Sequence, residues 1–469
     1  MAKLFRQLQI ETADRRIVLG ISDDSRLVQK DWIFLARRGT VKNGADYVQE
    51  ALSKGAVVLW EKENAQNCYH CEDIAKAQEI LLRSFYEDPS RHLQVIGVTG
   101  TNAKTSVSNL LAQMLQSLDR KVMVIGTGAI RFLNQEIAID NTTPSACMLG
   151  NYFHQAILHG ISTIIMEVSS HAIDQNRIGF IRFDAVIYTN IASDHLDYHI
   201  TRTHYQYTKL KLRNYLKRNG ILIVNHDDES LHPLYSLDDH KVVTVGVKQA
   251  HLQISEMKLK PYGSSFCLEN IRYEMSLLGI HNVYNVAQCL VILHELNIEA
   301  EKRQRIVMSL HTVAGRMEFH TIGHTYAIID YAHTASSLSA LLETVSQIKE
   351  RRMIVICGCG GNRDRLKRKE MAQVALRYGD IAIFTTDNPR QEAPYQILYD
   401  MTQGLIGSYE IFENRFCAIK YAVKIAQEHD IIVIAGKGNE RFQVFFDKKY
   451  PFSDQAALRK ALEEIHYES

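Results

Sequence analysis

Short apolar runs recur along this chain, and they constrain its fold more than any other feature. Most of them are rich in Val and Ile and nearly continuously apolar: Leu93–Val98, Lys121–Ile125, Thr163–Val168, Ala185–Asn190, Gly220–Asn225, Arg352–Cys357, Asp380–Thr385 and Asp430–Ala435. Such runs are typical of strands buried on both faces of a parallel sheet. Helical stretches such as Ser106–Leu118 and Leu366–Arg377 separate them. The alternation predicts an α/β fold with helices on both faces of its sheets.

Two stretches interrupt this rhythm and divide the chain. Residues 1 to about 90 carry weaker strand and helix signals, and Lys241–Ser276 is typical of antiparallel strands. A second α/β rhythm starts near Tyr326. We therefore expect three domains at 1–91, 92–316 and 317–469, which agrees with a length of 469 residues at about 150 residues per domain.

The charge balance excludes several classes of partner. The chain has 54 Lys and Arg against 53 Asp and Glu, so no global field attracts nucleic acid or an anionic membrane. The basic run Arg363–Lys369 lacks aromatic residues and is interpreted as a solvated helix face. No apolar run approaches the roughly 18 residues of a membrane span, and no leader opens the chain. We expect a cytoplasmic monomer with no nucleic-acid partner and no membrane insertion.

Cysteine usage fits the same compartment. Eight cysteines in 469 residues are too few for a disulfide framework, so free thiols in a reducing compartment are expected. Cys68 and Cys71 form one CxxC pair, but Cys357 and Cys359 do not supply a second pair with zinc-site spacing. We interpret these cysteines as free thiols rather than metal ligands.

A phosphate-binding loop is predicted between the strand at Leu93–Val98 and the helix that follows it. Its residues are Gly100, Thr101, Asn102, Ala103, Lys104 and Thr105. Backbone N–H groups at such a turn face an anion, the lysine reaches phosphates and the threonine hydroxyl binds Mg²⁺. Ala103 stands where glycine normally precedes the lysine, and a positive φ there would cost about 1 kcal/mol. The alternative is an ordinary strand-to-helix turn.

This loop and the motifs after it resemble the Mur ligases, the ATP-dependent ligases that build the peptidoglycan stem peptide. Further motifs follow in the family's order: Asn141–Pro144, Met166–His171, Thr189–Asn190, Asp194–His199, Asn225–Asp228, Gly279–Asn285, Gly315–Glu318, Asp330–Thr334, Gly358–Asp364, Asp387–Arg390 and Ala435–Glu440. The resemblance runs from Ser22 to the end of the chain. It implies a small N-terminal α/β domain for the UDP-sugar, a central P-loop-type ATPase domain with a small antiparallel sheet, and a C-terminal Rossmann-like domain for the amino acid.

The resemblance also implies the chemistry. ATP phosphorylates a carboxylate to an acyl phosphate, which the incoming amine attacks. The residues assigned to catalysis are Lys104, Glu167, His195 and Lys209, and Mg²⁺ is assigned to Thr105, Glu167, His195 and Lys209, the last as its carbamate. Three of these assignments have a plainer alternative: a helix N-terminal charge for Glu167, a zinc hydrolase for the Asp194–His199 cluster that contains His195, and a solvated helix lysine for Lys209.

Binding residues come from the same resemblance. For ATP these are Gly100–Thr105 with Asn282, Arg316 and Asp330. For the UDP-sugar substrate they are Ser25, Asn141, Thr142, Thr143, Ser169, Gln175 and Arg177. Hydroxyls and an arginine suit phosphate, sugar and carboxylate groups, although Ser and Thr in such loops more often cap helices. Arg316 could instead pair with Glu318, and Asn282 could cap a helix.

The tetrapeptide Asp387, Asn388, Pro389 and Arg390 indicates which amino acid is added. In the family it marks enzymes that add meso-diaminopimelate, whose far carboxylate a guanidinium can bind bidentately. Arg363, Gly436 and Glu440 match the rest of that pocket. The implied partners are therefore ATP, meso-diaminopimelate and UDP-N-acetylmuramoyl-L-alanyl-D-glutamate. The plain alternative for Arg390 is a turn residue paired with Glu392.

Three other functions stay open at this point. A relative that adds lysine or another diamino acid would share most motifs. A folylpolyglutamate synthetase shares the ATP chemistry and the fold. A non-catalytic sensor of nucleotide or cell-wall precursor is motivated by Ala103 and by Asn439, which replaces the family's histidine beside Glu440.

Overall fold

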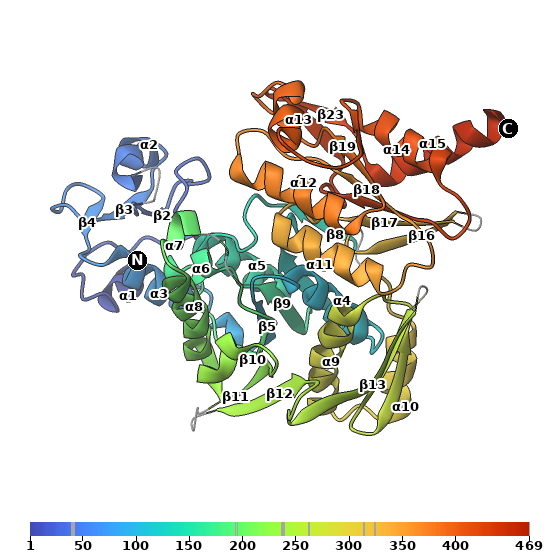
Figure 1. Cartoon of the computed structure of the whole chain (residues 1–469). Coiled ribbons are helices and arrows are strands. Elements are labelled where there is room, and N and C mark those ends of the chain that lie inside the picture. Colours follow the sequence, from blue (N-terminus) through green and yellow to red (C-terminus); the bar gives the residue numbers. More distant parts are fainter. Residues whose placement is uncertain are drawn as a thin grey trace. The chain divides into compact units, whose positions relative to one another are not determined.

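The structure is a computed structural model, and its described residues form two compact units. It describes residues 1–38, 43–192, 194, 196–235, 240–260, 263–312, 315–322 and 325–468, with the backbone alone at 196, 197, 322 and 465–468. One unit contains Met1–Ile254 and Tyr284–Glu299, and the other contains Ser255–Val283 and Ala300–Ser469. Figure 1 labels their helices and strands. Each unit is described by itself.

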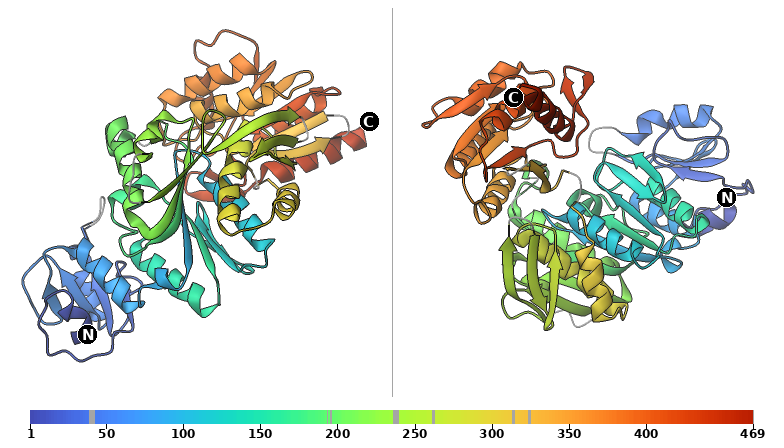
Figure 2. Two further views of the ribbon diagram at one scale, coloured as in Figure 1. Left: turned by 90° about the horizontal axis from the view of Figure 1, so that it is seen from below. Right: turned by 90° about the vertical axis from the view of Figure 1, so that its right-hand side faces the viewer.

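The first unit begins with a small parallel sheet, drawn in blue in Figure 2. Its strands lie in the order β1 (Gly20–Ser22), β2 (Trp32–Leu35), β3 (Val57–Trp60) and β4 (Cys68–His70). Its helical segments are α1 (Ala2–Arg6), η1 (Gly44–Tyr47), α2 (Val48–Ser53), α3 (Ile74–Phe85) and η2 (Pro89–Arg91). Successive residues of β2 enter different cores, because Ile33 and Leu35 face one side of the sheet and Phe34 the other.

A larger sheet forms the rest of the first unit. Within this unit its order is β13-β12-β11-β10-β5-β9-β6-β7-β8, and β13 belongs to the unit only as far as Ile254. The strands are β5 (Gln94–Thr99), β6 (Val122–Gly126), β7 (Ala129–Phe132), β8 (Gln135–Ala138), β9 (Thr163–Glu167), β10 (Phe183–Tyr188), β11 (Leu216–Asn225), β12 (Lys241–Gly246) and β13 (Leu252–Lys260). The pairs from β12 to β6 are parallel, whereas β6, β7 and β8 are antiparallel. The five strands predicted here from apolar runs are confirmed.

Helices connect these strands as a parallel sheet requires. They are α4 (Lys104–Gln116), α5 (Ala146–Leu158), α6 (Ser170–Asp174), α7 (Leu196–His199), α8 (Arg202–Leu210), η3 (Lys211–Tyr215) and η4 (Glu229–Leu234). Helix α9 (Ile280–Glu295) connects none of these strands and belongs to this unit only from Tyr284 onward. None of the helices in the described part of the chain is both long and apolar enough to cross a membrane.

The prediction of antiparallel strands over Lys241–Ser276 is partly wrong. Strand β12 pairs parallel with both β11 and the start of β13. The connection from β11 to β12 contains η4 and is long enough for a crossover, so no hairpin forms there. In the second unit β14 (Gly263–Leu268) and β15 (Ile271–Met275) do form an antiparallel hairpin. Glu269 and Asn270 both have positive φ at its two-residue turn, which matches strand twist.

The second unit is built around a sheet of order β16-β17-β21-β18-β19-β20. The strands are β16 (Glu318–Ile322), β17 (Thr325–Asp330), β18 (Met353–Cys357), β19 (Ile381–Thr385), β20 (Tyr409–Phe412) and β21 (Ile431–Ala435). Only the β16–β17 pair is antiparallel among those described. The three strands predicted here are confirmed as β18, β19 and β21.

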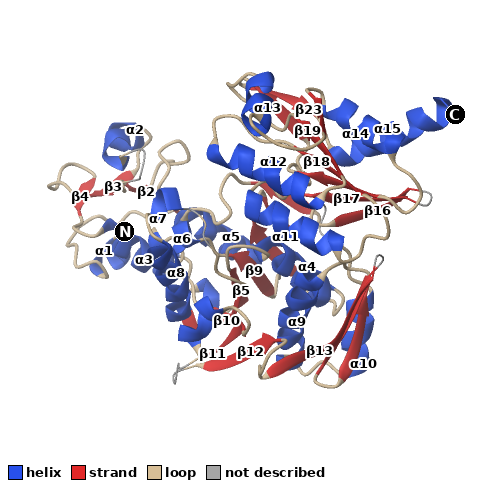
Figure 3. Cartoon of the chain, in the orientation of Figure 1, coloured by secondary structure: helices blue, strands red, loops and turns tan. Residues whose placement is uncertain are grey.

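Helices cover both faces of this sheet (Figure 3). On one face α11 (Ala335–Ser346), α12 (Leu366–Tyr378) and α13 (Pro394–Thr402) pack on Val355 and Val433. On the other face α14 (Arg415–Ile425) and α15 (Asp454–Glu468) pack on Ile354 and Ile432. Helix α10 (Ala300–Met308) and the hairpin of β22 (Phe442–Phe445) and β23 (Lys448–Pro451) complete the unit. The doubly covered parallel sheet explains why β18, β19 and β21 are nearly continuously apolar.

Candidate functional site

The predicted phosphate loop lies between β5 and α4 and is fixed by the end of β10. A Cβ on Gly100, whose φ is 154°, would collide with Thr189 Oγ1, so only glycine fits there. Thr101 N donates to Asn190 O at 2.7 Å, and Asn102 N donates to Asn190 Oδ1 at 2.9 Å. These bonds hold the loop in one conformation at the N-terminus of α4, where anions bind favourably.

Ala103 adopts the conformation that normally requires glycine. Its φ is 66° and its ψ is −1°, immediately before the first residue of α4. The positive φ considered from the sequence is therefore present in the structure. An L-residue in this region carries local backbone strain.

Two lysines bond to the same loop carbonyl. Lys104 Nζ donates to Gly100 O at 2.8 Å and to Thr101 O at 2.9 Å. Lys209 Nζ, from the last turn of α8, donates to Gly100 O at 2.8 Å and lies 4.9 Å from the centre of the Tyr205 ring. The alternative of a solvated helix lysine is wrong for Lys209, because that residue is only 1% exposed.

The surroundings of Lys209 favour its neutral amine. Burial, and then the positive charge of Lys104, lower the pKa of Lys209 well below its ordinary value, and Asp194 opposes this only in part. A neutral amine is the form that can react with CO₂. Burial and a neighbouring cation thus supply the physical requirement for carbamylation.

Glu167 ends β9 and points at the start of α4. Its Oε2 accepts hydrogen bonds from Thr105 Oγ1 and Thr127 Oγ1, both at 3.1 Å, and its Oε1 accepts one from Thr127 N at 3.1 Å. A Cβ on Gly126 would collide with this carboxylate. The donor set of hydroxyl and carboxylate oxygens is the kind that Mg²⁺ prefers, so Thr105 and Glu167 fit that ion.

His195, predicted for catalysis and metal binding, lies outside the described residues, as does the side chain of Asp197. The zinc interpretation of the Asp194–His199 cluster therefore stays untested. In the same cluster His199 is buried, with its Nε2 2.9 Å from Ser170 Oγ at the start of α6.

The predicted UDP-substrate residues divide into two groups within the first unit. Thr143, Ser169, Gln175 and Arg177 gather beside Glu167: Thr143 Oγ1 donates to the Glu167 carbonyl at 2.9 Å, and Arg177 donates to the Thr143 carbonyl at 2.7 Å. Arg177 also binds Gln175 Oε1 through Nε and Nη2, at 3.0 and 2.6 Å. Burial lowers the pKa of the Arg177 guanidinium. Ser169 Oγ caps α6, as hydroxyls in such loops often do.

The remaining members of this set are Ser25, Asn141 and Thr142. Ser25 follows the first strand of the small sheet, and its Oγ donates to Glu50 Oε2 at 2.8 Å. Asn141 is exposed, and Thr142 Oγ1 lies 3.1 Å from Thr127 Oγ1. Asp23, close to Ser25 in the chain, accepts a hydrogen bond from Ser145 Oγ at the start of α5. This bond links the segment after β1 of the small sheet to a helix of the larger sheet.

The residues predicted for the nucleotide base and sugar lie in the second unit. Asp330 ends β17 and accepts bonds from Met317 N at 2.7 Å and Ala332 N at 2.8 Å. Burial raises the pKa of the Asp330 carboxyl. Arg316 lies over the Tyr331 ring at 4.6 Å, and Asn282 Nδ2 donates to the Leu278 carbonyl at 2.9 Å. The alternative pairing of Arg316 with Glu318 is not among the ion pairs of the described residues.

The predicted amino-acid residues gather after strands β18, β19 and β21, at their carboxyl ends. Ligands bind at this edge of open parallel sheets. Asn388 Nδ2 donates to Glu440 Oε2 at 2.9 Å, and Gly436, with φ 118°, lies against Asp387. Pro389 is buried beside them, and Arg363 is exposed on the neighbouring loop.

Arg390 is fixed by its backbone and by its guanidinium. Its N–H donates to Val444 O at 2.9 Å, and its carbonyl accepts from Phe446 N at 2.7 Å. Its Nη1 donates to Gly361 O at 2.8 Å. The alternative of a pair with Glu392 is wrong, because Glu392 is bound by arginines of the basic run instead.

The interpretation of the basic run as a solvated helix face also needs correction. Arg368 is fully buried and bonds Glu392 at 2.9 Å and Asp400 at 2.7 Å, while exposed Arg365 bonds Glu392 at 3.2 Å. The hydrogen bond from Arg368 has the largest effect on Glu392 and outweighs the opposing effect of burial, so the pKa of Glu392 is lowered to about 2. This ion-pair cluster ties α12 to the segment that carries Arg390.

Two side chains at these sites escaped the sequence reasoning. Thr127 positions Glu167, but it is an ordinary threonine after a strand and carries no motif signal. Lys437 is buried within the Ala435–Glu440 motif and bonds Glu440 Oε2 at 2.7 Å. Its place between two glycines of a motif was a usable signal.

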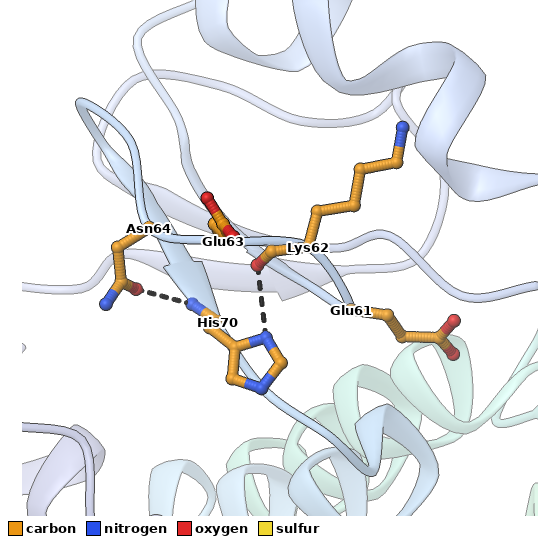
Figure 4. Close-up of a pocket in the computed structure, with 5 residues that line it drawn as sticks. All are labelled: Glu61, Lys62, Glu63, Asn64 and His70. Carbon is orange, nitrogen blue, oxygen red and sulfur yellow. Dashed lines mark hydrogen bonds between the residues drawn. The ribbon is translucent and has the colours of Figure 1, made fainter.

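A separate hollow of about 560 Å³ lies on the small N-terminal sheet and is drawn in Figure 4. Glu61, Lys62, Glu63, Asn64 and His70 line it. His70 N donates to Asn64 Oδ1 at 2.7 Å, and its ring Nδ1 lies 3.1 Å from the Lys62 carbonyl. None of the predicted site residues lines this hollow.

Comparisons with known proteins give the family. The profile of the Mur ligase middle domain matches residues 98–293, and that of the Mur ligase glutamate ligase domain matches 315–438. A UDP-N-acetylmuramoyl-L-alanyl-D-glutamate--2,6-diaminopimelate ligase of Listeria innocua is 35% identical over 461 residues, covering 95% of this chain and 94% of that protein. A ligase of the same name from Geobacillus thermodenitrificans is 35% identical over 469 residues, covering 95% of each.

Solved structures agree. One of a ligase of that same name superposes with a TM-score of 0.75 at 31% identity, covering 98% of this chain and 99% of that one. The UDP-N-acetylmuramoylalanyl-D-glutamyl-2,6-diaminopimelate--D-alanyl-D-alanyl ligase of Acinetobacter baumannii superposes with a TM-score of 0.63 at 17% identity, covering 100% of this chain and 98% of that one, and shows a shared fold. The chain therefore belongs to the Mur ligase family and is an ATP-dependent acid–amino-acid ligase.

Proposed function

We propose that this ligase adds meso-diaminopimelate to UDP-N-acetylmuramoyl-L-alanyl-D-glutamate. The observation that carries the proposal is Arg390, which is fixed to Gly361 O after strand β19, at the same edge of the C-terminal sheet as the bonded pair Asn388 and Glu440. A guanidinium suits the second carboxylate of meso-diaminopimelate and repels the terminal ammonium of lysine. The names of the relatives at 35% identity support the same substrate.

In this proposal the reaction forms an acyl phosphate. The γ-phosphoryl group of ATP passes to the glutamate carboxylate, ADP leaves, and the diamino acid's amine attacks the acyl carbon with loss of phosphate. Lys104 and the N–H groups of Gly100–Thr105 hold the phosphates, and positioning with charge neutralisation supplies most of the catalysis. Asn282, Arg316 and Asp330 bind the base and sugar.

We further propose that Thr105 and Glu167 hold one Mg²⁺, and that His195 and the carbamate of Lys209 hold a second. When bound, Mg²⁺ supplies positive charge that neutralises phosphate oxygens. Neutral Lys209 would take up CO₂ and thereby turn a cation at this place into an anion. The depressed pKa of Lys209 supports this step.

The other assignments rest on the same ordered motifs. Ser25, Asn141, Thr142, Thr143, Ser169, Gln175 and Arg177 bind the UDP-linked dipeptide in this proposal. Domains at 1–91, 92–316 and 317–469 bind the UDP-sugar, ATP and the amino acid, respectively. We place the enzyme in the cytoplasm as a monomer.

The test is phosphate release by the full chain with ATP, Mg²⁺ and the UDP-dipeptide, against meso-diaminopimelate, L-lysine and L-ornithine. We expect kcat/KM for meso-diaminopimelate to exceed that for L-lysine at least a hundredfold. A preference for L-lysine would overturn the proposal and make the chain a lysine-adding ligase. Turnover without the UDP-dipeptide but with a folate would indicate the folylpolyglutamate activity instead.

A further inference from the structure

A fully buried ammonium lies inside the proposed amino-acid pocket. Lys437 has no exposed surface, and its Nζ is 2.7 Å from Glu440 Oε2, 3.3 Å from Asn388 Oδ1 and 3.4 Å from Asp387 Oδ1. Its three partners are all residues predicted to bind the diamino acid. None of the roles assigned from the sequence includes Lys437 itself.

The backbone gives Lys437 little freedom to move. It follows β21 between Gly436 and Gly438, which have φ of 118° and 54°. Gly436 N donates to Asp330 O at 3.0 Å, and a Cβ on Gly438 would lie 2.7 Å from the Gly315 carbonyl. Glu440 N donates back to the Lys437 carbonyl at 3.0 Å. Lysine and glutamate are therefore presented from one tight turn.

The ammonium changes the charge that a substrate meets. Asp387 and Glu440 are two carboxylates at one place, and Lys437 offsets one of their two negative charges, apart from the guanidinium groups of Arg363 and Arg390 in the same proposed pocket. Nearby Arg415 is paired with Asp454, so that pair adds no net charge. Among the described residues, Glu440 Oε1 accepts no hydrogen bond, whereas Oε2 accepts two. One carboxylate oxygen is thus directed by Lys437 and Asn388 while the other stays available to a ligand.

We propose that Lys437 is a positioning residue that determines specificity. It orients the Glu440 carboxylate, and it adjusts the charge of the pocket to a substrate end that carries one ammonium and one carboxylate. The inference rests on the proposed function. The far end of meso-diaminopimelate carries one ammonium and one carboxylate and has no net charge, whereas the far end of lysine is a cation. A pocket with one more negative charge would favour the cation, so the buried lysine acts against lysine as a substrate.

The test compares K437M and K437R with the parent enzyme in the phosphate-release assay. For K437M we expect the KM for meso-diaminopimelate to rise at least tenfold, with KM for ATP and for the UDP-dipeptide within twofold. The ratio of kcat/KM for meso-diaminopimelate to that for L-lysine should fall at least tenfold. K437R keeps the positive charge and should recover, on a logarithmic scale, at least half of the selectivity lost in K437M. Calorimetric titration of meso-diaminopimelate should show the same loss of affinity.

Arg352→Met is the matched control. Arg352 pairs with buried Asp430 at the amino ends of the same strands, so its loss should lower the Tm but leave KM for meso-diaminopimelate within twofold. Equal KM increases for all three substrates in K437M, or an unchanged selectivity ratio, would overturn the inference. A parent enzyme that prefers L-lysine would overturn the proposed function instead, and is recognised before any variant is made.

Discussion

Replacing Ala103 by glycine should stabilise the first unit. Alanine at φ 66° and ψ −1° has its Cβ close to backbone oxygen, which costs about 1–2 kcal/mol for an L-residue in the left-handed region. Glycine escapes this cost but loses about 0.4–1 kcal/mol through the greater freedom of the unfolded chain. The midpoints of these two ranges, about 1.5 and 0.7 kcal/mol, give an expected net gain of about 0.8 kcal/mol. The loop keeps its conformation, because Asn190 and Thr189 hold its neighbours.

Thermal unfolding of the full chain without nucleotide measures the effect. For a cooperative unit of roughly 150–250 residues, 1 kcal/mol shifts the Tm by about 2–4 °C, so Ala103→Gly should raise the transition of the first unit by about 1–4 °C. Two control variants should lower it. Ala103→Val places a β-branched residue at positive φ, and Ala112→Gly puts glycine inside α4, where it costs about 1 kcal/mol.

Two results would refute this reasoning. A Tm that is unchanged or lower in Ala103→Gly, with Ala112→Gly behaving as expected, would mean that Ala103 carries no relievable strain. A tenfold change in KM for ATP would mean that the methyl group acts on nucleotide binding rather than on backbone conformation. We expect KM for ATP to stay within twofold.

Three further predictions concern the sites. Arg390→Ala should lower kcat/KM for meso-diaminopimelate about 10–150-fold and leave KM for ATP within twofold, because a hydrogen bond to a charged group contributes about 1.5–3 kcal/mol. The control Arg365→Ala, at an exposed neighbouring residue, should leave both kinetic parameters within twofold. Equal losses for both substrates in Arg390→Ala would contradict the proposed role of Arg390 in binding the diamino acid. The pKa of Lys209 is depressed in the folded protein, so below about pH 10.4 this residue binds more protons in the unfolded chain, and the free energy of unfolding should rise with pH. In CO₂-free buffer, Lys209→Met should flatten this rise, raise the Tm at pH 7 and abolish phosphate release. An unchanged pH slope would argue against a buried neutral amine. Thr127→Val removes a hydroxyl that positions Glu167 and should raise the Mg²⁺ concentration for half-maximal phosphate release about tenfold, whereas an unchanged Mg²⁺ dependence would separate Glu167 from the metal.

The fold was predictable where local sequence decides structure. Strands buried on both faces of a parallel sheet are nearly continuously apolar, so runs such as Thr163–Val168 and Asp430–Ala435 identify β9 and β21 directly. Strand direction is another matter, because β12 has the composition of a hairpin strand and its parallel pairing depends on the path of the connection from β11. The hairpin of β22 and β23 is short and partly exposed, and its sequence gives little periodic signal.

The sequence motifs select the candidate site residues, but they do not give the partners of those side chains. Ordered motifs singled out Glu167, Arg390 and Glu440; in the structure Glu167 ends β9, and the other two lie in the loops after β19 and β21. No sequence pattern could show that Arg368 turns inward from a basic helix face, because that depends on Glu392 and Asp400 arriving from other segments. The burial of a single side chain depends on the packing of elements that are distant in the sequence. The periodicity of one helix indicates only the average burial of a helix face.

Two buried lysines show how far partners decide chemistry. Lys209 and Lys437 are both almost without exposed surface, and both lie beside predicted ligand residues. Lys209 bonds a backbone carbonyl and has Lys104 as its neighbour, so its surroundings disfavour a charge and favour a nucleophilic amine. Lys437 bonds carboxylate oxygens of Glu440 and Asp387, which stabilise an ammonium. The first surroundings suit a lysine that reacts, and the second suit a lysine that directs its neighbours. The oxygens and cations around each buried lysine thus decide its role. Substitution by methionine should remove reactivity at position 209 and substrate selectivity at position 437.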